Sequence, residues 1–317
     1  MATRDHLKPD RSVCLSNGPG RESPTYSPYR RPTLVSPPRL LKVSSISRKS
    51  DMHRRTFLTS SLVAPMLRTA SATAQSSPAP TQKFVQLRHY TVAPGGAQTL
   101  DAYFRDALIP AANRQGVSPI GVFTSWFGPE SLSGRYLLLP GDSLDTIARL
   151  DAVLAADDVY ARAAAGFLDA APAQSPFLRL ETSLVQTMRR LPAFGVPAEF
   201  ANSKTRLFEL RTYVQPTLAS HARKVAMFEE GEANILAKCG FTAVFHGINL
   251  IGSGFPGAGL PSLTYMWVYP NLAQRQAAEE AWGASEERRT FFELMKYVNT
   301  PSTISNIILQ PASYSQM

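Results

Sequence analysis

Two polar residues, Glu232 and His246, stand where the surrounding sequence predicts a buried apolar side chain. Glu232 lies four residues after Phe228 and three before Ile235, which places it on the apolar face of a predicted helix. His246 lies within a largely apolar run that is typical of a strand. A buried carboxylate needs a cation or a hydrogen-bond donor, and we expect Arg211 or His246 to serve. Glu232 and His246 could then act as an acid/base pair.

A second interpretation of Glu232 stays open. Glutamate is rarely fully buried, and Glu232 could instead lie at the edge of the apolar face, beside Gly231, and reach solvent. In that case the residue would have no chemical role.

Arginine and tyrosine two residues apart could orient a substrate oxygen, and the chain has this pair twice, as Arg211 with Tyr213 and as Arg88 with Tyr90. Both pairs belong to a Leu-Arg-x-Tyr motif in a predicted strand, so each pair shares one strand face. We expect that face to line the inside of a barrel and to form a polar pocket. The alternative is ion pairing with Glu209, which the recurrence of the motif favours.

Tyr265 and Trp267 alternate onto one face of another predicted strand and could form an aromatic wall for a flat apolar ligand. The alternative is ordinary packing between a sheet and its helices. The sequence has no metal-ligand spacing, phosphate-binding loop or nucleophile elbow. We therefore predict neither a metal site nor a cofactor.

These candidates belong to two copies of one pattern. Each copy reads strand, helix, strand, strand, helix, strand, which is the ferredoxin-like order. Gly116 and Gly240 are 124 positions apart, whereas Tyr136 and Tyr265 are 129 apart, which indicates an insertion between them. At the offset of 124, Glu232 and His246 of the second copy align with Leu108 and Val122 of the first.

The repeat predicts an α+β fold. A single ferredoxin-like unit leaves one face of its sheet uncovered, so we expect the two tandem units to form a pseudo-dimeric α/β barrel with the helices outside. We expect the units at 83–185 and 205–317, joined by a linker at 186–204. The duplication could supply both halves of the barrel in a monomer, and a homodimer is the alternative.

Charge separates the leader from the folded part. Residues 1–74 contain 13 of the 33 Lys and Arg and 4 of the 24 Asp and Glu, so they carry the whole net charge of +9. The remainder has 20 residues of each sign. This balance argues against nucleic acid as a partner.

The leader has the pattern of a twin-arginine export signal. Arg54 and Arg55 precede an apolar run that is too short to serve as a membrane anchor, and small residues end at Ala74, where we expect cleavage. The signal thus spans 52–74, with the twin-arginine machinery as partner and the periplasm or exterior as destination. We expect translation to begin at Met52 and residues 1–51 to be a disordered, misassigned extension.

The second copy resembles the NIPSNAP family in four segments, at 208–213, 228–232, 240–245 and 260–266. The first copy resembles it more weakly. The resemblance implies the dimeric α/β-barrel superfamily, whose members include cofactor-free monooxygenases and haem-handling enzymes, and haem ligation by His246 is one hypothesis that follows. The family has no settled activity. We therefore expect an exported protein that binds a small aromatic or carbonyl-containing ligand in the second repeat, or else a non-catalytic interaction module.

Overall fold

The computed structural model describes residues 81–126, 134–201, 203–252, 259 and 261–317. All of them belong to one unit of the chain, Thr73–Met317. The predicted extension at 1–51, the start at Met52, the Arg54 and Arg55 pair and the cleavage after Ala74 lie outside the described residues.

The first repeat follows the predicted element order. Its elements are β1 (Phe84–Val92), α1 (Ala97–Ala102), the π-helical turn η1 (Tyr103–Leu108), α2 (Ile109–Arg114), β2 (Gly121–Ser125), β3 (Gly134–Gly141), α4 (Leu144–Ala155), α5 (Asp158–Leu168), the short η2 (Pro172–Gln174) and β4 (Phe177–Thr187).

The second repeat has the same order after a connection that contains α6 (Ala198–Ala201). Its elements are β5 (Leu207–Val214), α7 (Leu218–Met227), the π-helical turn η3 (Phe228–Glu232), α8 (Ala233–Lys238), β6 (Thr242–Ile251), β7 (Ser262–Tyr269), α9 (Leu272–Ala284), α10 (Glu286–Phe292), η4 (Met295–Tyr297) and β8 (Thr303–Pro311).

Local sequence explains where several helices begin. Ser143 and Asn271 accept hydrogen bonds from backbone N–H groups three residues on and thereby cap α4 and α9, as their residue types predict. Thr217 and Ser220 form a reciprocal capping box at the start of α7. Gly116 and Gly240, which follow α2 and α8, both have positive φ, a conformation that glycine adopts without a steric cost.

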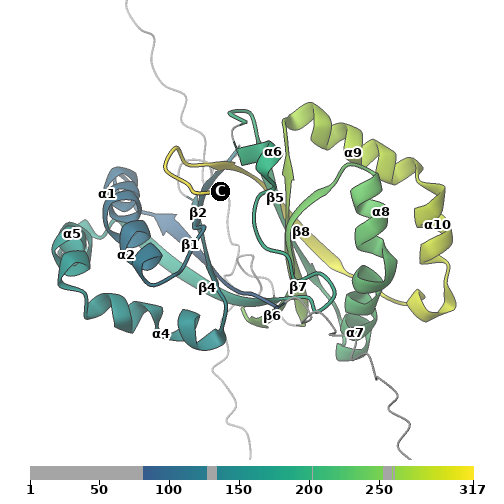
Figure 1. Ribbon diagram of the computed structural model, residues 1–317, viewed down its shortest axis with the longest axis horizontal. Coiled ribbons are helices and arrows are strands. Elements are labelled where there is room, and N and C mark those ends of the chain that lie inside the picture. The colour runs from purple at the N-terminus through teal and green to yellow at the C-terminus, as the bar shows by residue number, and fades with distance from the viewer. Residues whose placement is uncertain (1–80, 127–133, 202, 253–258, 260) are drawn as a thin grey trace, which may run out of the picture. The chain divides into compact units, whose positions relative to one another are not determined.

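The strands form one closed antiparallel barrel in the order β1-β3-β2-β8-β5-β7-β6-β4, with β4 paired back to β1. Two seams join the repeats, β2 with β8 and β4 with β6. The helices of the first repeat lie on one flank of the barrel and α7 to α10 lie on the other (Figure 1). The prediction of two ferredoxin-like units that close into a pseudo-dimeric α/β barrel is confirmed.

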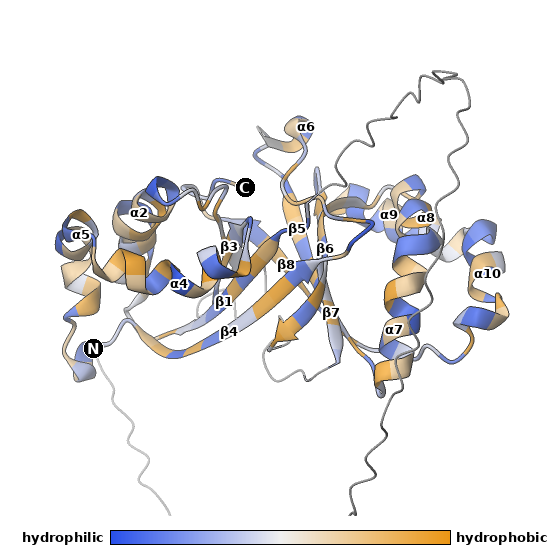
Figure 2. Ribbon diagram, turned by 60° about the horizontal axis from the view of Figure 1, so that its bottom comes forward, coloured by the Kyte–Doolittle hydropathy of each residue, from blue (hydrophilic) through white to orange (hydrophobic). Residues whose placement is uncertain are grey.

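The barrel interior is apolar and is built from both repeats. Along the strands, orange and blue segments alternate in Figure 2, as the period of two requires. Leu87 of β1 and Leu210 of β5 point inward, and the interior cluster also contains Val85, Phe123, Tyr136, Leu138, Val185, Phe208, Val244, Phe245, Met266, Val268 and Leu309.

The prediction that the Arg and Tyr pairs line this interior is wrong. Leu87 and Leu210 occupy it, so their neighbours in the Leu-Arg-x-Tyr motif, Arg88 and Arg211, lie on the opposite face, beneath the helices. Tyr90 packs in the first helix-covered cluster and Tyr213 against the second. Alternation identifies which residues share a face, but both faces of these strands are buried, so polarity cannot tell which one meets the helices.

The third strands also correct the predicted alignment of the repeats. Arg88 pairs with Leu137 in the β1–β3 ladder, and Arg211 pairs with Tyr265 in the β5–β7 ladder. Tyr265 is therefore equivalent to Leu137, at an offset of 128, rather than to Tyr136. Among the helices that the structure describes, none combines the length and apolar character of a membrane span.

The seam between β4 and β6 offers a test of barrel closure. Gly247 of β6 lies opposite Thr187 of β4, and a Cβ at position 247 would collide with the side chain of Val185. Gly247→Val should destabilise the protein by about 1–3 kcal/mol in urea unfolding, because the strands cannot separate without opening the barrel. Combined with Val185→Ala, the loss should be smaller than the sum of the two single losses. Simple additivity would contradict this seam.

Candidate functional site

Glu232 is buried and its partner is Lys224. The Lys224 Nζ donates to both carboxylate oxygens of Glu232, at 2.9 and 2.7 Å. The Lys224 and Glu232 side chains are 5% and 3% exposed, respectively. Burial raises the pKa of the Glu232 carboxyl, and the neighbouring Lys224 charge partly offsets this effect. The chain therefore holds an ion pair almost fully out of water.

The π-helical turn η3 explains why residues eight positions apart can meet. In a regular α-helix, eight residues overshoot two turns by about 80°, which would put Glu232 to one side of Lys224. A π turn takes up about one additional residue, so the side chains before and after η3 return to the same face. The prediction of Arg211 or His246 as partner is wrong, because the π turn brings Lys224 to Glu232, which a regular helix would not do.

Lys224 was missed by sequence reasoning, although a signal was present. At the offset of 124 that aligns Glu232 with Leu108, Lys224 aligns with Leu100. A lysine at the position of a core leucine is as unusual as a glutamate there.

Aromatic rings surround the Lys224 ammonium group. Its Nζ lies 5.3 Å from the ring centre of Tyr213, 5.1 Å from that of Phe228 and 5.3 Å from that of Phe292. These separations lie within the range of cation–π attraction. One carboxylate and three rings thus form the environment of this amine, together with the Met227 sulfur at 3.7 Å.

Two tyrosines extend the polar cluster over the sheet. The ring centres of Tyr213 and Tyr265 are 5.2 Å apart, and the two rings meet edge to face. Burial raises the pKa of both phenols, so they remain protonated at neutral pH and can donate hydrogen bonds.

His246 lies on the same sheet face but contacts aromatic rings rather than Glu232. Its ring centre is 4.9 Å from that of Trp267, 5.7 Å from that of Phe228 and 6.0 Å from that of Tyr265. The Nε2 of His246 and the Nε1 of Trp267 are buried without a hydrogen-bond partner. Burial lowers the pKa of His246 to about 4, so its imidazole is neutral at pH 7. Haem ligation by His246 would require these rings to move aside.

Arg211 belongs to a separate network that fastens α9 to the sheet. Glu209 is fully buried and accepts hydrogen bonds from Arg211, Arg275 and Asn306 at 2.7 to 3.1 Å. Arg211 also pairs with Glu279 of α9. Burial acts to raise the pKa of Glu209, but the hydrogen bond from Arg275 and the Arg211 charge hold it below its ordinary value. Ion pairing is thus what Arg211 does here.

The first repeat has a reduced version of this network. The Arg88 Nη2 donates to both carboxylate oxygens of Asp151 on α4, at 2.7 and 2.8 Å, and its Nε donates to Gln86. Gln86 and Arg88 occupy the positions of Glu209 and Arg211, so both repeats bind a helix to the sheet in this way.

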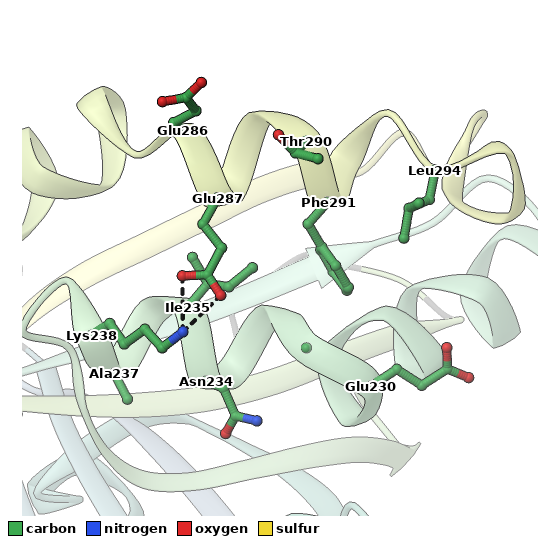
Figure 3. A pocket seen from close by; sticks show the side chains of 11 residues that line it. Glu230, Asn234, Ile235, Ala237, Lys238, Glu286, Glu287, Thr290, Phe291 and Leu294 are labelled. Carbon is green, nitrogen blue, oxygen red and sulfur yellow. Dashed lines mark hydrogen bonds and ion pairs between the residues drawn. The ribbon is translucent and has the colours of Figure 1, made fainter.

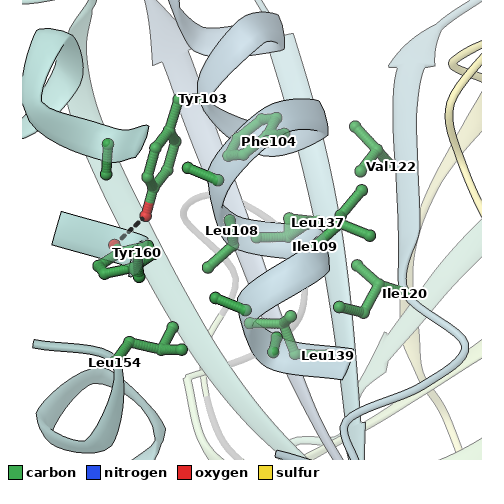
Figure 4. Packing of buried hydrophobic residues seen from close by; sticks show 14 of the residues in the cluster. Tyr103, Phe104, Leu108, Ile109, Ile120, Val122, Leu137, Leu139, Leu154 and Tyr160 are labelled. Carbon is green, nitrogen blue, oxygen red and sulfur yellow. Dashed lines mark hydrogen bonds between the residues drawn. The ribbon is translucent and has the colours of Figure 1, made fainter. Parts of the chain in front are cut away.

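The polar cluster of the second repeat has an aliphatic counterpart in the first. Lys224, Glu232, His246 and Tyr265 correspond, in that order, to Leu100, Leu108, Val122 and Leu137. All four aliphatic residues are completely buried in one hydrophobic cluster. Three of them, Leu108, Val122 and Leu137, are shown together in Figure 4. The fold therefore accepts a purely apolar set at these positions.

A groove of about 970 Å³ lies between α8 and α10, beside the buried pair (Figure 3). Its lining includes Gly231, Ile235 and Phe291, and the Lys238–Glu287 ion pair crosses it. The Phe291 ring packs so closely on Gly231 that a Cβ there would collide with it. Phe291 and the turn that bears Glu232 therefore meet in the lining of the groove. In the described part of the chain, no group of three His, Cys, Asp or Glu side chains could hold a metal ion.

The fold and this cluster place the protein among α+β barrels built from two ferredoxin-like units. Residues 208–316 match the NIPSNAP family model, so the second repeat is a NIPSNAP domain. A comparison with curated proteins finds no match.

Solved structures share the fold at low identity. A proposed monooxygenase from Lactobacillus acidophilus NCFM is 8% identical over 73% of this chain and 94% of its own, with a TM-score of 0.46. An uncharacterized NIPSNAP-like domain protein from Burkholderia xenovorans is 18% identical over 35% and 90%, with a TM-score of 0.31. A chlorite dismutase from Candidatus Nitrospira defluvii is 8% identical over 72% and 91%, with a TM-score of 0.38. Likeness at this level does not carry their chemistry to this chain.

The Glu209 network predicts a large stability loss on truncation. Glu209→Ala would leave Arg211 and Arg275 without their shared buried carboxylate, so the free energy of unfolding should fall by about 3–5 kcal/mol in urea titration. The control is Glu287→Ala, which removes a carboxylate from the exposed pair with Lys238 and should cost less than about 1 kcal/mol. Equal losses in the two variants would contradict the role of Glu209.

His246 predicts a specific dependence of stability on pH. Burial depresses its pKa from 6.5 to about 4, so between these values the unfolded chain binds a proton that the folded chain refuses. Stability therefore falls as the pH drops through this window, by about 2 kcal/mol at pH 5. His246→Val, which installs the residue of the first repeat, should reduce the difference in unfolding free energy between pH 7.5 and pH 5 by that amount. An unchanged difference would show that His246 titrates normally.

Proposed function

We propose that this protein is exported by the twin-arginine route and binds a small ligand in the helix-covered layer of its second repeat. The ligand carries a carbonyl group attached to an aromatic or other flat apolar body. Lys224 and Glu232 form the acid/base pair of the site, and Tyr213 and Tyr265 orient the ligand oxygen. This replaces the predicted pairing of Glu232 with His246.

One observation carries the proposal. Four buried positions are polar in the second repeat and aliphatic in the first, at the same places in the same fold. A buried ion pair is often no more stable than the hydrophobic residues that could replace it. The leucines at positions 100 and 108 are such a replacement, so stability does not account for Lys224 and Glu232. We attribute these two polar residues to selection for ligand binding.

The chemistry of the cluster supports the ligand class. An ammonium group and two protonated phenols are hydrogen-bond donors, and a carbonyl oxygen accepts from all of them. The rings of Phe228 and Trp267 provide flat apolar surface. The buried and unpartnered nitrogens of His246 and Trp267 offer further polar contacts at the far side of the cluster. Such a mixture of aromatic walls and few polar groups is typical of small-molecule sites.

The alternative is a non-catalytic interaction module in which the cluster is only packed core. It is favoured by one observation, namely that the Lys224–Glu232 pair is complete without any ligand. Ligand binding separates the two candidates. Because the two repeats complete the barrel within one chain, a monomer is sufficient for either.

The ligand proposal is tested by copying the first repeat into the second. Lys224→Leu combined with Glu232→Leu should abolish co-purifying ligand in native mass spectrometry and thermal stabilisation by a panel of aromatic aldehydes and ketones. The control removes the exposed Asp145–Arg149 pair of α4 with two alanines, which keeps the same net charge and should leave binding unchanged. A folded double-leucine variant that binds as the wild type does would refute the site.

The export proposal is tested separately. Arg54→Lys combined with Arg55→Lys should leave the uncleaved precursor in the cytoplasm, because the translocation machinery reads the arginine pair as an address. Cell fractionation and intact mass would follow precursor and mature chain, the latter shortened after Ala74. Arg68→Lys, outside the pair, is the control. Normal appearance of the double-lysine variant in the periplasm would exclude this route.

A further inference from the structure

The amine of Lys224 lies in a buried environment that is rare for lysine. It is removed from water, Glu232 is its anionic partner, and the centres of three aromatic rings lie 5.1 to 5.3 Å from it. Shielding from water is one way in which a lysine becomes a nucleophile toward carbonyl groups, and the Glu232 carboxylate lies within hydrogen-bond reach to accept the proton that the amine must lose. The same aromatic rings would also stabilise a planar iminium cation formed on the Lys224 nitrogen.

We propose that Lys224 forms a reversible imine with an aldehyde or ketone bound at this site. The inference rests on the proposed function, because it names the reaction of the carbonyl ligand with the lysine beneath it. It goes further in assigning a covalent bond to Lys224 Nζ.

The step balances without any other reagent. Glu232 takes a proton from the Lys224 ammonium group, and the free amine attacks the carbonyl carbon. The proton that the nitrogen then loses passes to the former carbonyl oxygen, which gives a neutral carbinolamine. A proton returned by Glu232 to the hydroxyl group then lets water leave as the nitrogen lone pair forms the C=N bond. One ammonium ion and one carbonyl compound thus give one iminium ion and one water.

The residues around Lys224 stabilise both the iminium ion and the carbinolamine from which it forms. The iminium nitrogen keeps its positive charge, so it retains the Glu232 carboxylate and the rings of Tyr213, Phe228 and Phe292 as partners. Tyr213 and Tyr265 are protonated phenols on the sheet side of the cluster and can donate to the carbinolamine oxygen.

In this proposal the ligand enters from the groove beside α10, whose lining includes Gly231 but not Lys224. α10 has no buried residue, and its Phe292 forms one wall of the Lys224 enclosure while Phe291 faces the groove. Two ion pairs hold this region, Lys238 with Glu287 and Lys296 with Glu230, and each involves an exposed lysine. Exposed pairs contribute little to stability, so the main cost of moving α10 aside is the packing of Phe291 on Gly231 and of Phe292 on Trp282.

The experiment traps the imine by reduction. The mature chain is incubated with 4-hydroxybenzaldehyde and sodium cyanoborohydride, and modified lysines are located by peptide mass spectrometry. Lys224 should be modified at least 10-fold faster than the exposed Lys238 and Lys296. Glu232→Gln should slow the reaction at Lys224 at least 10-fold, and Lys224→Arg, which keeps the charge, should yield no adduct from this segment. 4-Hydroxybenzyl alcohol, which has the same body without the carbonyl, should bind without forming an adduct.

The outcomes separate this inference from the function on which it rests. Thermal stabilisation by both compounds, with Lys224 modified no faster than the exposed lysines, would overturn the imine and leave the ligand site intact. If neither compound nor any member of the carbonyl panel binds, both proposals fail. Selective modification of Lys224 that persists in Glu232→Gln at an unchanged rate would overturn the role of the carboxylate.

Discussion

The fold depends on covering two sheet faces that no helix reaches. Each repeat places its helices on one side of its four strands, which leaves an apolar face that includes Leu87 in one sheet and Leu210 in the other. The two faces bury each other, and the seams at β2–β8 and β4–β6 turn the contact into a closed barrel without an exposed edge. This shared interior serves both repeats equally, so neither can change its inward residues alone.

The helix-covered layers are free of that constraint, and there the repeats have diverged. Both keep an arginine that binds a helix carboxylate, Arg88 with Asp151 and Arg211 with Glu279. They differ directly beneath the π-helical turn, where the first repeat buries leucines and the second buries Lys224 and Glu232. A duplicated domain can keep one copy as a scaffold while the other acquires polar groups. The apolar first repeat then shows which side chains fill these positions when only the fold has to be maintained.

Periodicity and turn chemistry were enough to predict the element order and the repeat, since glycines, caps and strand alternation are local signals. The candidate site was less accessible. Both faces of β1 and β5 are buried, so the sequence does not indicate whether Arg211 lies in the barrel interior or beneath the helices. A π-helical turn is not visible in an apolar pattern, and a helix read at 3.6 residues per turn puts Val225, rather than Lys224, on the buried side. Tyr136, one residue before Leu137, makes a misleading match for Tyr265 in a sequence alignment of the repeats.

The central claim is that the buried Lys224–Glu232 pair is not required by the fold. A double-mutant cycle on the unfolding free energy in urea tests it most directly. Lys224→Leu and Glu232→Leu should each cost about 3–5 kcal/mol, because each leaves a buried charge alone. Together they should restore at least the wild-type value, since leucines fill the equivalent positions 100 and 108. A double variant as unstable as either single one would contradict the claim and make the pair a structural element.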